Sequence, residues 1–172
     1  TRRSSDLCVE PMFSISNEIS YNNKMVLATP SLNANDELSY LPVSSWINVE
    51  SNNSDFIQNT STKELKALND FVSKYNIKSY YLISPFKSIY KAVEIKDDSV
   101  GTVHTFQGKE TDVVFILLGG NTATNSKSWV SSKPNILNVA VTRAKKRNYI
   151  IGDKNIWKKH NYFQNTINIL DQ

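Results

Sequence analysis

A polar, glycine-containing segment directly ahead of an apolar run constrains this chain more than any other feature. Residues 101–110 read GTVHTFQGKE, and residues 113–118 read VVFILL. A short continuous apolar run bounded by turn residues is typical of a strand buried on both faces of a parallel sheet. A buried strand by itself does not require a Gln-Gly-Lys-Glu segment before it. A loop that binds a phosphate or a sugar does require such a segment. The sequence therefore predicts a ligand-facing turn docked onto a buried strand.

A second motif lies about one short helix further along the chain. Residues 138–147 read NVAVTRAKKR and run into YIIGD at residues 149–153. The spacing predicts a helix over residues 133–146, with Pro134 in its first turn. Its apolar stripe consists of Ile136, Leu137, Ala140, Val141 and Ala144.

The rest of the chain alternates between apolar runs of helical and of strand character. Helices are expected at residues 11–20, 62–75, 87–96, 133–146 and from 154 onward, and strands at 41–49, 80–83, 99–103, 112–118 and 148–151. Residues 29–39, 51–60 and 119–132 are polar and are expected to form loops. Alternating strands and helices predict an α/β fold with a parallel sheet and helices on both faces. At 172 residues, the chain is expected to form a single domain, or one lobe of a larger protein.

Composition excludes several classes of site. The single cysteine, Cys8, forms no disulfide within the chain, which favours a reducing compartment. With His104 and His160 as the only histidines, a structural zinc site and other metal centres are not expected. No apolar stretch approaches the roughly 20 residues that a membrane span needs, and no signal peptide is visible. A cytoplasmic or nucleoid-associated protein without a membrane partner is expected.

The formal net charge of +4 mildly favours a polyanionic partner. Many of the cations crowd into one stretch: Lys133, Arg143, Lys145, Lys146, Arg147, Lys154, Lys158 and Lys159. The alternative reading is a solvated helix end, where cations also interact favourably with the helix dipole.

The first motif is not a P-loop. Gly101 and Gly108 stand seven residues apart, whereas the P-loop glycines stand five apart, and Glu110 occupies the place of the Ser or Thr that would bind magnesium. No other segment qualifies. The chain is therefore not expected to hold Mg-nucleotide by itself in the usual way.

Together the two motifs resemble motifs V and VI of superfamily 1 helicases, in the branch that contains the nonsense-mediated-decay RNA helicase and its DNA-directed relatives. PMFSISN at residues 11–17 resembles the stretch that begins at motif IV, and ISPFK at residues 83–87 resembles the segment beside the nucleic-acid path. The resemblance covers nearly the whole chain. It implies a RecA-like fold and the C-terminal motor lobe of an ATP-dependent, 5′-to-3′ DNA or RNA helicase.

In that family the first lobe carries the Walker motifs, and the second contributes residues across the cleft between the lobes. The resemblance thus implies ATP and Mg²⁺ as cofactors, bound mainly by an N-terminal lobe. It also implies single-stranded DNA or RNA and that N-terminal lobe as partners. The isolated chain is expected to be inactive.

Arg143 is the candidate catalytic residue. On ideal helical spacing it lies about 90° from the centre of the apolar stripe, so its side chain could leave the core and reach across a cleft. A guanidinium presents a rigid, permanently charged fork that suits a transferring phosphoryl group. The resemblance implies an arginine finger, and the alternative is a solvated or salt-bridged helix arginine.

The turn before the apolar strand holds the candidate cofactor-binding residues. Gly108 is expected to permit close backbone approach or a positive φ. Glu110 only accepts hydrogen bonds when ionised, so it suits a ribose hydroxyl better than a phosphate, although it could instead pair with Lys109. The resemblance places Gln107 and Glu110 near the nucleotide sugar. It also implies a phosphate contact for the arginine pair at residues 2–3, with Arg3 as the candidate and Arg2 as the alternative.

Two segments are candidates for nucleic-acid binding. By resemblance, Thr102, His104 and Thr105 contact the nucleic-acid backbone through hydroxyl, imidazole and main-chain donors. The second segment consists of Pro85, Phe86 and Lys87.

Exposed aromatic side chains could also stack on bases. The candidates are Trp129, Phe86, Tyr90 and Phe106. Phe106, next to the buried strand, is expected to be core packing. Phe86 is the preferred stacking residue, because Pro85 is expected to turn the chain out of its strand.

Two other functions compete with the helicase reading. A non-catalytic nucleic-acid-binding module could keep a degenerate helicase fold, although such a module has no use for Gln107, Glu110 and Arg143. A small-molecule hydrolase is not supported, because the sequence has neither a Gly-x-Ser-x-Gly elbow nor a histidine-bearing triad.

Overall fold

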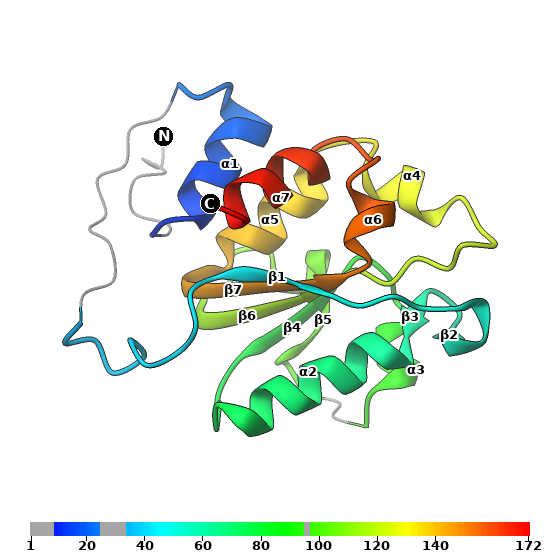
Figure 1. The fold of residues 1–172 in the computed structure, drawn as a ribbon, viewed down its shortest axis with the longest axis horizontal. Helices are drawn as coiled ribbons and strands as arrows, with labels where there is room; N and C mark the ends of the chain where they lie inside the picture. The colour runs from blue at the N-terminus through cyan, green and yellow to red at the C-terminus, as the bar shows by residue number, and fades with distance from the viewer. Residues whose placement is uncertain (1–8, 25–33, 95–96) are drawn as a thin grey trace.

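The computed structural model describes residues 9–24, 34–94 and 97–172 (Figure 1). Arg2, Arg3 and Cys8 lie outside the described residues. The strands form a five-stranded parallel sheet in the order β1-β7-β6-β4-β5. Their bounds are β1 Ser45–Asn48, β4 Tyr81–Ser84, β5 Val100–Thr102, β6 Thr111–Leu117 and β7 Ala144–Gly152.

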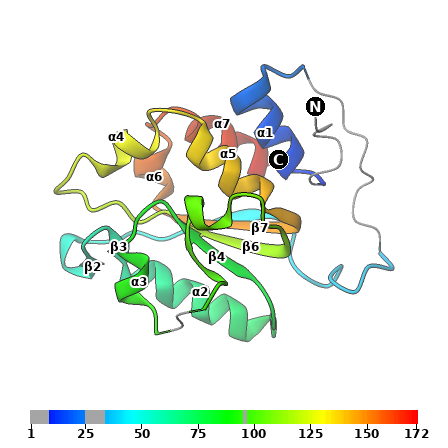
Figure 2. The ribbon, with the colours of Figure 1, turned by 180° about the vertical axis from the view of Figure 1, so that it is seen from behind.

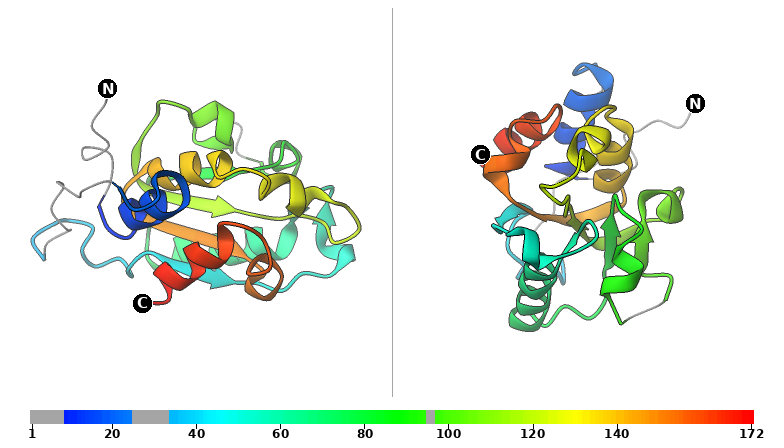
Figure 3. Two further views of the ribbon diagram at one scale, coloured as in Figure 1. Left: turned by 90° about the horizontal axis from the view of Figure 1, so that it is seen from above. Right: turned by 90° about the vertical axis from the view of Figure 1, so that its right-hand side faces the viewer.

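Helices cover both faces of the sheet (Figures 1 and 2). The two views of Figure 3 show the same two helical layers from other directions. One face carries α1 Met12–Tyr21, α4 Ser126–Val130, α5 Asn135–Thr142, α6 Lys154–Trp157 and α7 Phe163–Leu170. The other face carries α2 Thr62–Lys74 and α3 Ile89–Ala92. The predicted α/β fold with a parallel sheet between helices is confirmed, and it is consistent with a RecA-like architecture.

The central strands divide their side chains between two cores. Val114 and Ile116 of β6 belong to the cluster beneath α1, α5 and α7. Phe115 and Leu117 belong to the cluster beneath α2, where Phe115 also meets Tyr149 of β7 at a ring-centroid distance of 5.3 Å. Because successive strand residues point to opposite faces, a continuous apolar run fills both cores at once.

Local capping explains where α2 begins. Ser61 is its N-cap, and the Ser61 hydroxyl accepts a 3.2 Å hydrogen bond from the Glu64 N–H. The helix therefore begins at Thr62, the first residue of the expected helix over residues 62–75.

The predicted helix over residues 133–146 is too long. α5 ends at Thr142, with Arg143 as its C-cap, and β7 begins at once at Ala144. The Thr111 N–H donates to the Arg143 carbonyl over 3.0 Å, and Thr111 pairs with Ala144 in the parallel ladder. Because of this pairing with β6, the strand begins at Ala144, four residues before the predicted strand over residues 148–151.

The basic residues after Arg143 therefore lie on a strand. Lys145 and Lys146 are on β7, and Arg147 pairs with Val113 in the ladder. The expectation that Lys145 and Lys146 continue a helix is wrong, and for these two lysines the alternative of a solvated helix end is wrong as well.

Other boundaries differ where the chain forms short elements. The expected loop over residues 51–60 contains a 3₁₀ turn, η2 Asn53–Asp55, and the strand β2 Phe56–Ile57, which pairs with β3 Thr60–Ser61. The expected loop over residues 119–132 contains α4. The expected helix over 87–96 is reduced to α3, and the expected strand over 41–49 is reduced to β1.

Candidate functional site

The turn at residues 107–110 and Arg143 lie side by side at the edge of the sheet that the amino ends of its strands form. The turn precedes β6 and Arg143 precedes β7, and these two strands are parallel neighbours. Both sites therefore lie at the amino ends of their strands.

The Arg143 side chain is held by three neutral oxygens. Nε donates to the Val139 carbonyl over 3.1 Å, Nη2 to the Thr142 hydroxyl over 3.2 Å, and Nη1 to the Phe106 carbonyl over 3.4 Å. The residue is only partly buried. The predicted continuation of the helix beyond Arg143 is wrong, because Arg143 caps the helix. The three bonds nevertheless fix the guanidinium at the sheet edge.

The Phe106 carbonyl connects Arg143 to the glycine turn. The same oxygen accepts the Lys109 N–H over 2.9 Å. Gly108 has a φ of +82°, so the predicted positive φ is confirmed. Gln107 and Gly108 are exposed, and Glu110 is partly buried. The structure thus brings four predicted residues to one edge: Gln107, Gly108, Glu110 and Arg143.

The alternative pairing of Glu110 with Lys109 does not occur among the described residues, where no salt bridge joins them. Lys109 Nζ instead lies 6.0 Å from the centre of the Phe106 ring.

The two predicted nucleic-acid segments meet at the opposite edge of the sheet, which the carboxyl ends of the strands form. Ser84 at the end of β4 pairs with Thr102 at the end of β5, so Pro85 and Lys87 follow one strand where the Thr102 segment follows its neighbour. The Tyr90 hydroxyl accepts the Thr102 N–H over 3.3 Å and lies 2.9 Å from the Thr105 hydroxyl.

The accessibility of these residues is uneven. Lys87 and His104 are exposed, Pro85 and Thr105 are partly buried, and Thr102 is buried.

The expectation that Phe86 turns outward is wrong. Its side chain is 8% exposed and belongs to the core. Pro85 does turn the chain, but the Phe86 N–H bonds back to the Ser84 hydroxyl over 3.2 Å and the ring packs inward. The exposed neighbour is Trp129, whose ring centre lies 6.1 Å from that of Phe86.

One short segment joins the two edges. The 3₁₀ turn η3, Val103–Phe106, leads from the carboxyl end of β5 to the turn before β6. Phe106 is fully buried, as expected for core packing, and its ring lies 4.7 Å from that of Tyr81. The segment from Thr102 to Glu110 therefore contributes to both candidate sites.

Part of the basic stretch is neutralised within the fold. Lys146 lies 2.9 Å from Asp36 and 3.8 Å from Asp112. Its hydrogen bond to Asp36 raises the pKa of Lys146. Lys154 pairs with Asp171 over 2.9 Å. These lysines are less available to a polyanion than their crowding in the sequence indicated.

A buried polar cluster at the end of β6 was not predicted. Glu64 of α2 accepts the Gly119 N–H over 2.8 Å, and the Lys127 ammonium bonds to the Gly120 carbonyl. Burial raises the pKa of Glu64 to about 8, against the opposing effects of the Gly119 N–H and the Lys127 charge. Burial lowers the pKa of Lys127. The available signal was the position of Glu64 four residues before Leu68, on the buried side of its helix.

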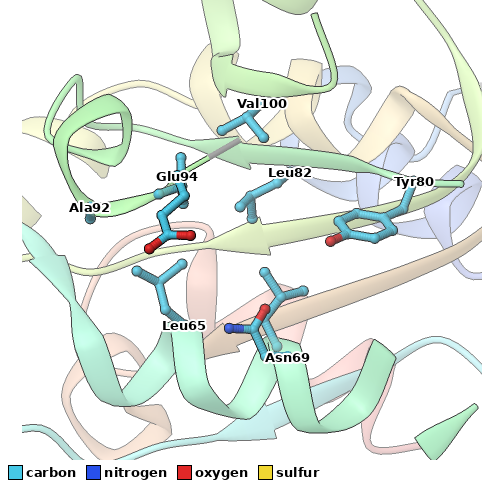
Figure 4. A pocket seen from close by; sticks show the side chains of 9 residues that line it. Leu65, Asn69, Tyr80, Leu82, Ala92, Glu94 and Val100 are labelled. Carbon is cyan, nitrogen blue, oxygen red and sulfur yellow. The ribbon is translucent and has the colours of Figure 1, made fainter. Parts of the chain in front are cut away.

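A separate pocket of about 340 Å³ lies between α2 and the sheet (Figure 4). Leu65 and Asn69 of α2 face Tyr80, Leu82 and Val100 across it, and Ala92 and Glu94 lie at one end. Val93 and Leu68 line it as well. None of the predicted site residues lines it.

Two negative findings concern the described residues. Within residues 9–24, 34–94 and 97–172, no cluster of three or more His, Cys, Asp or Glu side chains is arranged to hold a metal ion. No helix in the same part of the chain has both the length and the apolar character to cross a bilayer.

Comparison with known proteins identifies the family. A family model described as an AAA domain matches residues 10–155, which include the sheet, the turn at residues 107–110 and Arg143. No curated protein matches the chain significantly. The matched domain occurs in superfamily 1 helicases and has the α/β architecture described above. The chain therefore belongs to this AAA domain family and is a helicase-type ATPase domain.

Proposed function

We propose that the chain is the second, C-terminal RecA-like lobe of an ATP-dependent superfamily 1 helicase that steps along single-stranded DNA or RNA. The observation that carries the proposal is the shared Phe106 carbonyl, which binds both Arg143 and the turn at residues 107–110. Two motifs more than 30 residues apart are thereby held as one unit at a sheet edge. Such a unit can face a nucleotide held by a second lobe.

The nucleotide-facing roles follow from the chemistry of the side chains. ATP, when bound with Mg²⁺ mainly by an N-terminal lobe, supplies the phosphoryl group to be hydrolysed. Arg143 directs a permanent charge toward that phosphate as an arginine finger. Glu110 and Gln107 bind the nucleotide sugar, and the exposed Gly108 backbone allows close approach. Arg3, which lies outside the described residues, is proposed to contact phosphate.

The opposite edge would carry the nucleic acid. Thr102, His104 and Thr105 offer hydroxyl, imidazole and backbone donors to phosphates, and Lys87 adds a positive charge. Phe86 supports this surface from beneath, since it is buried.

Because η3 links the two edges, movement of the turn when the lobes close would shift the residues that bind the nucleic acid. Such a link couples hydrolysis to stepping through a conformational change. The branch resemblance supports 5′-to-3′ polarity, and a cytoplasmic or nucleoid-associated location fits this function.

The test is to join the chain to a P-loop-bearing N-terminal lobe of the same family and to measure ATP hydrolysis with and without single strands. We expect hydrolysis that oligo-dT or oligo-U stimulates. Binding of single strands with no hydrolysis under any condition would instead support a non-catalytic nucleic-acid-binding module.

A further inference from the structure

Trp129 is the one exposed tryptophan of the chain. Trp46 and Trp157 are 8% and 0% exposed, whereas Trp129 is 54% exposed. Tryptophan carries a large apolar surface that proteins usually bury. An exposed indole ring therefore calls for an explanation in terms of what it contacts.

The structure holds Trp129 outward by anchoring the helix around it. Lys127 and Val130 of α4 are both buried, and the Lys127 ammonium bonds to the Gly120 carbonyl. The Ser131 hydroxyl bonds to the Lys127 carbonyl over 2.9 Å. Since the inward positions of this short helix are occupied, Trp129 points away from the core.

The position of Trp129 is at the edge proposed to carry nucleic acid. Phe86, two residues beyond the carboxyl end of β4, lies beneath it at a ring-centroid distance of 6.1 Å. Lys87, which follows Phe86, is exposed, and so is Lys133 shortly after α4. An aromatic ring thus lies close in the chain to cations, the combination that single-strand binders use.

The surroundings favour a nucleobase over a protein partner. The residues next to Trp129 on the exposed side, Asn125, Ser128 and Ser132, are polar and exposed. Protein interfaces need a contiguous apolar patch, whereas a single aromatic ring suffices to stack one base.

We infer that Trp129 is a stacking platform for one base of single-stranded nucleic acid. The inference rests on the proposed function and adds a base contact to a surface otherwise made of phosphate-binding groups. Every base has a π-face, so the contact tolerates any sequence and serves DNA and RNA alike. Phe86 supports the platform from below.

The chain allows a direct optical test. Stacking of a base on Trp129 should quench the fluorescence of its indole ring. Because the other two tryptophans are buried, a change in tryptophan fluorescence reports on Trp129. The chain is titrated with oligo-dT and with oligo-U at low salt, and binding is followed in parallel by the anisotropy of a dye on the strand. We expect quenching with both oligonucleotides along the same binding curve.

Substitutions separate the ring from the rest of the surface. Trp129→Phe keeps an aromatic face, so it should bind within about threefold of the natural chain but show no quenching. Trp129→Ala should weaken binding roughly 5- to 100-fold. Because Trp129 is exposed, both variants are expected to keep their thermal transition, which circular dichroism checks.

A strand of the same length with abasic sites supplies the matched control. It keeps the phosphates, so the natural chain and Trp129→Ala should bind it equally. An equal loss of affinity on both strands would overturn the inference, since Trp129 would then act on phosphates or on the fold. Binding without quenching, with Trp129→Ala unaffected, would overturn the inference alone and leave the proposed function standing. Failure to bind any single strand would contradict both.

Discussion

Arg143 donates a 3.4 Å hydrogen bond to the Phe106 carbonyl, and that same oxygen accepts the Lys109 N–H over 2.9 Å. The end of α5 and the turn before β6 therefore share one acceptor. A displacement of either segment disturbs the other, so the arginine and the turn are expected to act as one unit.

The isolated chain should hydrolyse ATP at a negligible rate, because its sequence has no P-loop. The measurement is phosphate release by rigorously purified chain, with Arg143→Ala as the control for contaminating activity. Turnover that survives purification and disappears in Arg143→Ala would show that the chain is an enzyme by itself.

Binding of single strands by the isolated chain should be weak and steeply dependent on salt. Phosphate contacts release counterions, so a few such contacts predict a loss of about 10-fold in affinity or more between low and physiological salt. Anisotropy titrations over a series of salt concentrations measure the slope. Tight binding that does not respond to salt would contradict a surface that binds the phosphates of the strand.

Two glycines with positive φ form a matched pair for a stability test. A Cβ at Gly119 would lie 2.0 Å from the Asn59 carbonyl oxygen, whereas a Cβ at Gly108 would meet nothing within 4 Å. Gly108→Ala should cost about 1 kcal/mol through backbone strain alone. Gly119→Ala should cost more than about 2 kcal/mol, because the backbone of residue 59 must also move.

Urea unfolding of the natural chain and both glycine variants measures these differences. Equal costs at the two positions would mean that the packing of residue 119 against Asn59 is not as the structure describes it.

Glu64 predicts a particular dependence of stability on pH. Its pKa rises on folding from an ordinary 4.5 to about 8, so between these values the folded state alone keeps the proton. The stabilisation is fully present below pH 4.5 and is lost as the pH rises through 8, by up to about 1.4 kcal/mol per pH unit.

Glu64→Gln isolates this contribution. The amide oxygen can still accept the Gly119 N–H. The charges of Lys127 and Asp153, which act on the pKa of Glu64, remain as in the natural chain, and so does His160, whose pKa is lowered by burial and by the charge of Lys127. We expect the free energy of unfolding of the variant to fall less steeply between pH 5 and pH 8. The same slope in both proteins would show that Glu64 does not titrate in this range.

The sequence was sufficient for the fold class and for the grouping of Gln107, Gly108, Glu110 and Arg143 at one edge of the sheet. The apolar run at residues 113–118 was predicted as a buried strand, and β6 confirms it, with the predicted turn at its amino end. Gly108 was correctly assigned a positive φ, because a Gly in this turn has no Cβ to oppose it.

The errors arose where tertiary pairing overrides local pattern. The stripe that ends at Ala144 fits a helix, but the ladder between Thr111 and Ala144 converts this residue to strand. Phe86 followed a proline and was expected outside. A bond from its N–H to Ser84 turns it inward, and no local pattern reveals that bond. The Glu64 cluster depends on Gly119, 55 residues away, and no local pattern links two residues so far apart in the chain.

The most direct test of the proposed function concerns Arg143 in the two-lobed protein that joins this chain to a P-loop-bearing lobe. Arg143→Ala should leave ATP affinity nearly intact and lower kcat by about 10³-fold or more, as loss of an arginine finger does. Arg143→Lys should restore little, because an ammonium lacks the bidentate fork. Lys145→Ala is the matched control, since Lys145 is exposed just two residues later on β7.

The measurement is single-turnover ATP hydrolysis at saturating single strand. The account predicts a rate near that of the unmodified protein for Lys145→Ala and a loss of about three orders of magnitude for Arg143→Ala. If Arg143→Ala hydrolysed ATP as fast as Lys145→Ala, Arg143 would be an ordinary helix-capping arginine and the proposed role of this lobe in catalysis would be wrong.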